Sequence, residues 1–264
     1  MPADFFWLHH INLKEIRAGI MNKSKFMSSS LLILTFGILI SGTAVAGESM
    51  AGINVANGET IFNEGKGDAA ACQGCHGEKA LGNDDMGAPR LANIGLAYVV
   101  KQLSDFAADR RVPDGAGSAM NGFAKALTEQ DRRDVAGYLY SLEFQSEPSD
   151  LKGLAASGNK VGKPELGEAI VTQGIKGKVP PCQDCHGFNG RAPRFPMINE
   201  QKFVYLVNQL NNWRSDSRAN DPTVDNVGIM RRIAKFLSDD DIANIAAFLS
   251  TAPRASPEGM KKNK

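Results

Sequence analysis

The 264-residue sequence predicts an all-α protein built from two similar helical domains in tandem. The first observation is an internal repeat, because the motif Cys-x-x-Cys-His occurs twice, once ending at His76 and once ending at His186. The second is helical periodicity: after each motif, apolar residues recur three or four positions apart, which marks one buried helix face. The third is that no stretch shows the sustained alternation of apolar and polar residues that indicates a strand.

The N-terminal segment has the organisation of an export signal. Lys23 and Lys25 precede an apolar run over 31–40, and small residues ending in Ala46 follow it. A basic, an apolar and a small-residue region in this order predict a signal peptide over residues 1–46, cleaved after Ala46, and hence a periplasmic protein.

Two points about this segment stay open. Residues 1–20 are interpreted as an extension upstream of a start at Met21. The alternative to cleavage is a retained membrane anchor, but the segment from 31 to 46 is short against the ~20 residues that a membrane-spanning helix needs. No other segment has the length and hydropathy to span a membrane.

The four cysteines carry the chemistry that the repeat points to. They form two Cys-x-x-Cys pairs, Cys72 with Cys75 and Cys182 with Cys185. A histidine follows each pair directly, which is the attachment pattern of c-type haem. We therefore predict two haem c groups bound covalently through the cysteines, with His76 and His186 as iron ligands.

Other interpretations of these cysteines explain less. A thioredoxin-like dithiol is expected after a β-branched strand, and neither pair has one. A four-cysteine zinc site would need the two pairs to converge and would not require a histidine after each. Two structural disulfides would suit an exported protein but leave both histidines unexplained.

The repeat also identifies the sixth iron ligands. His9 and His10 are lost with the signal peptide, so no histidine is left for a second axial position and methionine is the candidate. Met120 and Met230 follow their respective histidines at the same separation, and they are predicted as the ligands. The other methionines of the mature chain have no counterpart in the opposite repeat and are interpreted as core side chains: Met50, Met86, Met197 and Met260.

Helices are predicted at matching places in both repeats. Thr128 and Ser238 are expected N-caps, since an acidic residue follows each three positions later, as in a capping box. The helices that they begin carry apolar residues on one face: Val135, Tyr138, Leu139 and Leu142, and Ile242, Ile245, Phe248 and Leu249. Further helices are expected over about 95–107 and 200–213. The predicted domains are 47–146 and 165–264, joined by a linker over 147–164 that is rich in Gly, Pro, Ser and charge.

Together, the haem motifs, the Ala-Pro-Arg segments, the distal methionines and the terminal helices resemble class I cytochromes c. The duplication over residues 52–252 resembles the cytochrome c4 family of two-domain electron carriers. The resemblance implies that Pro89 and Pro193 offer backbone carbonyls to the proximal histidines. It also implies facing haem propionate edges, for which Tyr98 and Arg90 and their partners Tyr205 and Arg194 are the candidate lining residues. Surface packing or a salt bridge is the alternative role for each of them. One departure is that the loop from His186 to Pro193 is shorter than the loop from His76 to Pro89.

These features predict an electron-transfer protein rather than an enzyme, because an iron with six fixed ligands has no vacant position for a substrate. The expected role is a carrier between respiratory-chain donors and a terminal oxidase or reductase. A cytochrome subunit of a dehydrogenase complex and a dihaem redox enzyme are the alternatives. The formal net charge of +1 gives no reason to expect a nucleic-acid partner, and docking at the membrane surface stays open.

The charge is unevenly divided along the chain. Residues 47–150 hold 9 Lys and Arg against 16 Asp and Glu, a formal charge of −7, whereas residues 151–264 hold 17 against 11, a formal charge of +6. Such a division orients a molecule toward charged docking sites. We therefore hypothesise that the two domains face different redox partners.

Overall fold

The computed structural model describes residues 50–112, 115–187, 195–224 and 226–254, which belong to one unit that begins at Ala46. The predicted signal peptide and its cleavage site lie outside the described residues. Within the described ranges, no helix has the length and apolar character needed to cross a membrane.

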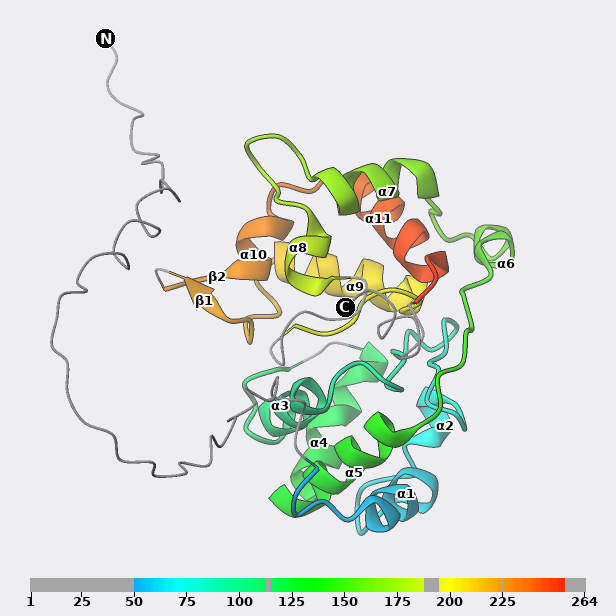
Figure 1. Cartoon of the computed structure of the whole chain (residues 1–264), viewed down its shortest axis with the longest axis vertical. Helices are drawn as coiled ribbons and strands as arrows, with labels where there is room; N and C mark the ends of the chain where they lie inside the picture. The colour runs from blue at the N-terminus through cyan, green and yellow to red at the C-terminus, as the bar shows by residue number, and fades with distance from the viewer. Residues whose placement is uncertain (1–49, 113–114, 188–194, 225, 255–264) are drawn as a thin grey trace, which may run out of the picture. The chain divides into compact units, whose positions relative to one another are not determined.

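The two halves of the chain contain the same succession of helices (Figure 1). The first half contains α1 (Val55–Glu64), α2 (Gln73–His76), α3 (Leu96–Ala107), α4 (Ala119–Ala126) and α5 (Glu129–Ser141), with a 3-10 turn at Gly115–Ser118 before α4. The second half contains α7 (Pro164–Gln173), α8 (Cys182–His186), α9 (Phe203–Arg214), α10 (Ile229–Ala234) and α11 (Asp239–Thr251). The predicted all-α fold of two tandem domains is confirmed.

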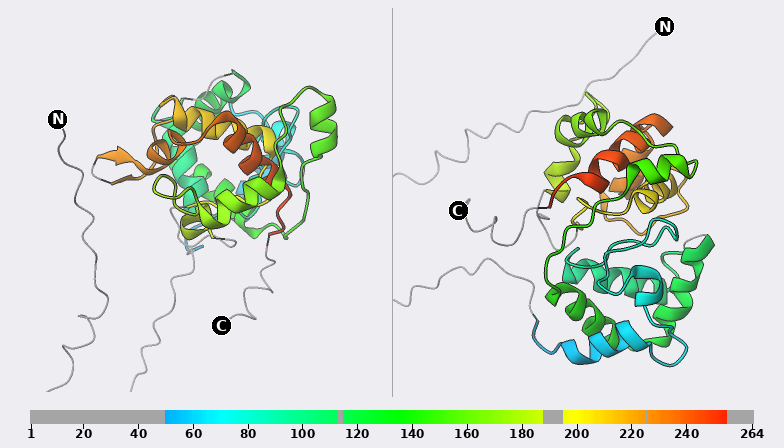
Figure 2. Two further views of the ribbon diagram at one scale, coloured as in Figure 1. Left: turned by 90° about the horizontal axis from the view of Figure 1, so that it is seen from above. Right: turned by 90° about the vertical axis from the view of Figure 1, so that its right-hand side faces the viewer.

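Each half has its own apolar core. Figure 2 shows the helices of the two halves as separate groups, and the buried apolar side chains form two clusters that share no residue. Phe62, Val135 and Leu139 are central to the first cluster, and Phe203 and Ile242 to the second. The repeat in the sequence is therefore a repeat of folding units.

The last helix of each half begins where the sequence predicted. The Thr128 hydroxyl accepts a hydrogen bond from the Asp131 backbone N–H, and the Asp131 carboxylate accepts one from the Thr128 N–H, which closes a capping box. Ser238 and Asp241 form the same box at the start of α11. These boxes satisfy backbone donors that a helix start leaves without partners.

A glycine allows the first and last helices of each half to cross closely. A Cβ atom at Gly58 in α1 would lie 2.0 Å from the Asp134 carbonyl oxygen of α5. At Gly167 in α7 it would lie 2.0 Å from the Asn244 carbonyl oxygen of α11. Only glycine permits backbones to approach this closely, so these two residues allow the close crossing of α1 with α5 and of α7 with α11.

Two elements were not expected from the sequence. The segment predicted as a linker contains a short helix, α6 (Leu151–Ala156), whose Leu154 is buried. In the second half, β1 (Thr223–Val224) and β2 (Val227–Gly228) form a two-stranded antiparallel hairpin just before α10.

Candidate cofactor site

The first Cys-x-x-Cys-His motif forms one helical turn, α2, which ends at a buried histidine. His76 is 7% exposed, and its Nδ1 lies 2.9 Å from the carbonyl oxygen of Pro89, as expected. A carbonyl only accepts hydrogen bonds, so Nδ1 carries the proton and Nε2 keeps its lone pair for a metal. Burial lowers the pKa of His76 although the Pro89 carbonyl opposes this, which favours the neutral imidazole that can act as a ligand.

The second motif has the same arrangement but uses a different proline. His186 is buried at the end of α8, and its Nδ1 lies 2.8 Å from the carbonyl oxygen of Pro196. Pro193, for which this role was predicted, lies outside the described residues. Because Nδ1 of His186 already donates to Pro196, the prediction for Pro193 is wrong and the role belongs to Pro196.

The register between the halves explains this correction. The separation between Tyr98 and Tyr205 along the chain equals the separation between Pro89 and Pro196. Asn93 and Glu200 share this register, and both have a left-handed backbone, with φ of 56° and 50°. Their N–H groups donate to the carbonyls of Leu139 and Leu249, at 3.2 and 2.7 Å. The prediction aligned Ala88-Pro89-Arg90 with Ala192-Pro193-Arg194, although the loop after His186 is shorter than the loop after His76. This alignment placed Pro193 instead of Pro196 opposite His186.

The surroundings of the cysteines differ from those of a redox-active dithiol. None of the four forms a disulfide, and the described residues contain no cluster of three or more His, Cys, Asp or Glu in which both pairs could share a metal. Burial raises the pKa of the Cys72 and Cys182 thiols to about 11. A redox-active dithiol has a lowered thiol pKa instead, so the structure gives no support to a thioredoxin-like pair.

Both motifs open onto one continuous cavity of about 630 Å³. His76 and His186 line it, and so do Met120 from α4 and Met230 from α10. Most of the remaining wall is apolar, and it includes Phe62, Ile94, Val99, Phe123, Leu127, Leu206, Ile233 and Leu249. A histidine nitrogen, a thioether sulfur and an apolar wall are the surroundings that a haem requires, so these residues fit the predicted cofactor.

The choice among methionines stays a prediction. Met86 and Met197 line the cavity as well, so position in the wall does not by itself select the ligand. Met120 and Met230 differ from them in lying at matching places, near the start of α4 and of α10. The two sites therefore agree with each other only when Met120 and Met230 are the ligands.

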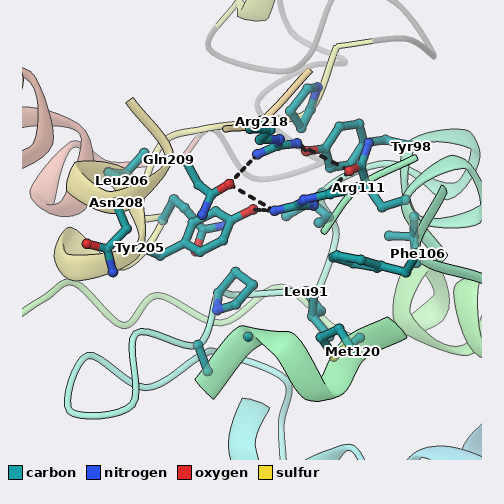
Figure 3. A pocket seen from close by; sticks show the side chains of 18 of the residues that line it. Leu91, Tyr98, Phe106, Arg111, Met120, Tyr205, Leu206, Asn208, Gln209 and Arg218 are labelled. Atoms are coloured by element: carbon teal, nitrogen blue, oxygen red, sulfur yellow. Dashed lines mark hydrogen bonds between the residues drawn. The ribbon is translucent and has the colours of Figure 1, made fainter. Parts of the chain in front are cut away.

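A polar cluster in the cavity wall was not predicted (Figure 3). Arg111 and Arg218 are both buried, and each bonds glutamine and tyrosine side chains that also line the cavity. A signal for this cluster was present in the sequence. Phe106-x-x-Asp-x-Arg111 recurs as Trp213-x-x-Asp-x-Arg218, in the same register that relates Tyr98 to Tyr205.

Tyr98 and Tyr205, which were expected at the haem edge, line the cavity, and Arg90 does not. Its side chain is completely buried, and both terminal nitrogens donate to the Gln145 carbonyl oxygen at 3.0 Å. One of them also lies 3.3 Å from a Glu200 carboxylate oxygen. Arg90 therefore joins the two halves of the chain, and Arg194 lies outside the described residues.

A buried histidine behind each Cys-x-x-Cys pair, held by a proline carbonyl beside an apolar cavity that contains methionine, defines a c-type cytochrome. The sequence pattern of the cytochrome c family matches residues 55–143. The chain is 33% identical over 200 residues to the thiosulfate dehydrogenase electron acceptor of Stutzerimonas stutzeri, a match that covers 74% of this chain and 86% of that protein. It is 32% identical over 237 residues to cytochrome c4 of Azotobacter vinelandii, covering 84% and 98%.

A solved structure shows the same fold. The thiosulfate dehydrogenase TsdBA of Marichromatium purpuratum superposes with a TM-score of 0.67 and 27% identity. The match covers 77% of this chain and 41% of that one. From its identity to the Azotobacter protein over nearly that protein's whole length, the chain belongs to the cytochrome c4 family. It is thus an electron-transfer cytochrome with covalently bound haem c.

Proposed function

We propose that the protein is a periplasmic dihaem electron carrier, not an enzyme, and that it shuttles electrons between respiratory-chain donors and a terminal oxidase or reductase. The observation that carries the proposal is that His76 with Met120 and His186 with Met230 line one cavity. If each pair holds one iron, both axial positions are taken at both sites. No coordination position is then left for a substrate.

The side chains have separate tasks in this proposal. Each bound haem supplies a one-electron couple between ferric and ferrous iron. Cys72 and Cys75 hold the first haem and Cys182 and Cys185 the second, so neither dissociates when its charge changes. The carbonyls of Pro89 and Pro196 fix the histidine rings and increase their basicity. The apolar wall keeps water away and, with methionine as the sixth ligand, favours ferrous iron.

A more specific donor is suggested by the relatives. A protein 33% identical to this chain is named as the electron acceptor of thiosulfate dehydrogenase. A second candidate function is therefore that of a cytochrome partner or subunit of a dehydrogenase of this kind. Size-exclusion chromatography of the native protein distinguishes the two, because a free carrier elutes at the size of one chain and a subunit elutes with its enzyme.

The charge of each half bears on partner choice. The first half carries a formal charge of −7 and the second a formal charge of +6. We therefore propose that the first half docks against a basic partner and the second half against an acidic one. Lys176 and Lys178 are exposed in the second half, shortly before Cys182. Reversing both to Glu is expected to weaken the salt dependence of electron transfer to an acidic acceptor. An unchanged salt dependence, measured by stopped flow, would refute this part of the proposal.

The ligation is tested by absorption spectroscopy of the oxidised holoprotein. Met120→Ala and Met230→Ala are each expected to remove half of the weak near-infrared band that arises from charge transfer between methionine sulfur and iron. Met86→Ala and Met197→Ala are the matched controls, because both side chains line the same cavity, and they are expected to keep the full band. A wild-type band corresponding to one haem per chain would mean that one iron is open or differently ligated, and would favour a redox enzyme.

A further inference from the structure

A side chain of the second half bonds the backbone beside the proline that holds His76. Gln201 is 5% exposed, and its side-chain amide pairs with both backbone polar groups of Arg90, the residue after Pro89. Oε1 of Gln201 accepts a hydrogen bond from the Arg90 N–H at 2.7 Å, and Nε2 donates to the Arg90 carbonyl oxygen at 3.0 Å. The second half thus holds the chain directly beyond the carbonyl that orients the predicted iron ligand.

Two hydrogen bonds act here on a single peptide unit. The carbonyl of Pro89 and the N–H of Arg90 belong to the same planar group. Nδ1 of His76 lies 2.9 Å from the oxygen at one end of this unit, and Oε1 of Gln201 accepts from the N–H at the other end. Hydrogen bonds at both ends of a peptide unit fix its plane and polarise it, which strengthens the bond to the histidine.

The amide of Gln201 has one orientation that satisfies all of its neighbours. Its Oε1 also accepts a hydrogen bond from the Lys202 backbone N–H at 2.9 Å. A flipped amide would turn its nitrogen toward two N–H groups and its oxygen toward a carbonyl, and neither arrangement forms a hydrogen bond. All three bonds are buried, where an unsatisfied polar group is costly. The side chain is therefore held in place by the protein itself.

The segment that carries Gln201 is tied to the last helix of its own half. Glu200 has a left-handed backbone, with φ of 50°, and its N–H donates to the Leu249 carbonyl of α11 at 2.7 Å. The Arg90 side chain adds a bond from the first half, because its Nε donates to the Glu200 carbonyl oxygen at 3.1 Å. The end of a helix in the second half is thereby connected to the peptide unit behind His76.

The contact in the opposite direction, from the first half to the second, is weaker. The separation along the chain that relates Pro89 to Pro196 also relates Ile94 to Gln201. The Ile94 carbonyl oxygen accepts a hydrogen bond from the N–H of Met197, the residue after Pro196, at 3.3 Å. Because isoleucine has no side-chain amide, this long main-chain bond takes the place of the amide pair. The two halves therefore hold each other's proline segments unequally.

We propose that Gln201 is a positioning residue for the iron ligand of the first haem, which fixes and polarises the peptide unit through which Pro89 holds His76. This inference rests on the proposed dihaem function, in which His76 is an iron ligand. A carbonyl bonded to Nδ1 of a ligating histidine orients the ring and raises its basicity. The second half of the protein thus sets the ligand strength at the first haem, and no side-chain amide does the same at the second.

The first test is proton NMR of the reduced holoprotein. Gln201→Met removes both hydrogen-bonding groups and keeps nearly the same side-chain length. The Nδ1 proton of His76 is expected to exchange with solvent faster by about threefold or more, because the carbonyl that accepts it is no longer fixed. The Nδ1 proton of His186 is expected to keep its wild-type exchange rate.

The second test is a spectroelectrochemical titration of the same variant. One of the two one-electron steps is expected to shift, so that the ratio of ferric to ferrous iron at a fixed potential falls by about threefold or more. The sign follows from the ligand, since a less basic histidine stabilises ferric iron less. The other step is expected to stay at its wild-type position.

Asn199→Leu is the matched control for both tests. Asn199 lies in the same segment and is equally buried, at 4% exposed, but its amide donates to the Pro253 carbonyl oxygen of its own half at 3.2 Å. Its loss also removes a buried hydrogen bond of this segment. The exchange rate of His76 and both reduction steps are nevertheless expected to match the wild type.

The other outcomes decide different points. If Gln201→Met leaves the exchange rate of His76 unchanged, the amide does not position the ring and the inference is overturned. If Asn199→Leu raises that rate as much as Gln201→Met does, the effect belongs to the whole segment and the inference is again overturned. A wild-type His76 ring without the ring-current shift of a haem ligand would instead remove the proposed function on which the inference rests.

A measurement on the wild-type protein gives the decision if Gln201→Met does not fold. The peptide unit behind His76 receives the amide of Gln201, whereas the unit behind His186 receives the long bond from Ile94. The Nδ1 proton of His76 is therefore expected to exchange about threefold more slowly than that of His186. Equal rates, or faster exchange at His76, would overturn the inference.

Discussion

Asp131 links the start of α5 to α1 and to the segment that follows α1. Its carboxylate accepts hydrogen bonds from the Thr128 backbone and hydroxyl, from Asn57 at 3.2 Å and from Lys66 at 2.7 Å. Burial raises the pKa of this carboxyl, but the bonds from Lys66, Thr128 and Asn57 outweigh burial and lower it well below its usual range. The charged carboxylate is therefore the form that stabilises the fold.

Asp131→Asn is expected to lower the free energy of unfolding at pH 7 by about 1–2 kcal/mol, through loss of the charged cap and of the Lys66 pair. A lowered folded-state pKa gives stability that is present above the unfolded value of about 3.9 and is lost as the pH falls. The difference between variant and wild type should thus shrink below about pH 4. Urea unfolding at pH 7 and pH 3 measures this.

Asp241→Asn is the control for this change. Asp241 closes the equivalent box at Ser238, but no lysine bond to its carboxylate is found among the described residues. Asp241→Asn should therefore lower the free energy of unfolding at pH 7 by less than Asp131→Asn does. Equal losses for Asp131→Asn at both pH values would contradict the role given to its charge.

The helix crossings depend on close backbone contact, which predicts a sharp difference between glycines. Gly58→Ala forces a Cβ atom against the Asp134 carbonyl, and is expected to lower the free energy of unfolding by about 3 kcal/mol. Gly122→Ala is the control, because a Cβ atom there meets nothing within 4 Å. It should stabilise α4 by up to about 1 kcal/mol, since alanine favours a helix more than glycine does. Thermal unfolding followed by circular dichroism measures both, and equal effects would contradict this packing.

Helices with repeated caps and apolar faces could be predicted from sequence, and those around α3, α5, α9 and α11 were. The short helix α6 could not, because six residues carry too little periodicity to identify a helix. The hairpin before α10 has two residues in each strand, which is likewise too short for a pattern. Pro196 was missed for a different reason. The loop after His186 differs in length from the loop after His76, and its residues were aligned by sequence similarity instead of by the register of the helix that follows.

Contacts between the halves were beyond sequence reasoning. Arginine side chains usually lie at the protein surface. Arg90 is nevertheless completely buried against Glu200 and Gln145. Arg254 similarly reaches across to the carbonyls of Ala92 and Asn93, at 3.1 and 2.7 Å. Such burial depends on how two separate domains pack, and neither local periodicity nor charge pattern reports that packing.

Arg90→Met is expected to separate the unfolding of the two halves. It leaves the Glu200 carboxylate buried without its cation, at a cost of about 3–5 kcal/mol. Calorimetry should then show a lower and broader transition, or two transitions, where the wild type shows one. Arg133→Met is the control, because its pair with Glu129 is exposed and should contribute less than about 1 kcal/mol. An unchanged transition for Arg90→Met would mean that this contact does not join the halves.

The whole molecule is proposed to be a closed two-electron carrier, and a reductive titration of the holoprotein tests this in one experiment. We predict that each chain takes up two electrons, and that carbon monoxide added to the reduced protein leaves its spectrum unchanged, because under the proposal Met120 and Met230 would leave no open position at either iron. Uptake of one electron per chain, or binding of carbon monoxide to one of the haems, would contradict the proposal and indicate a site open for catalysis.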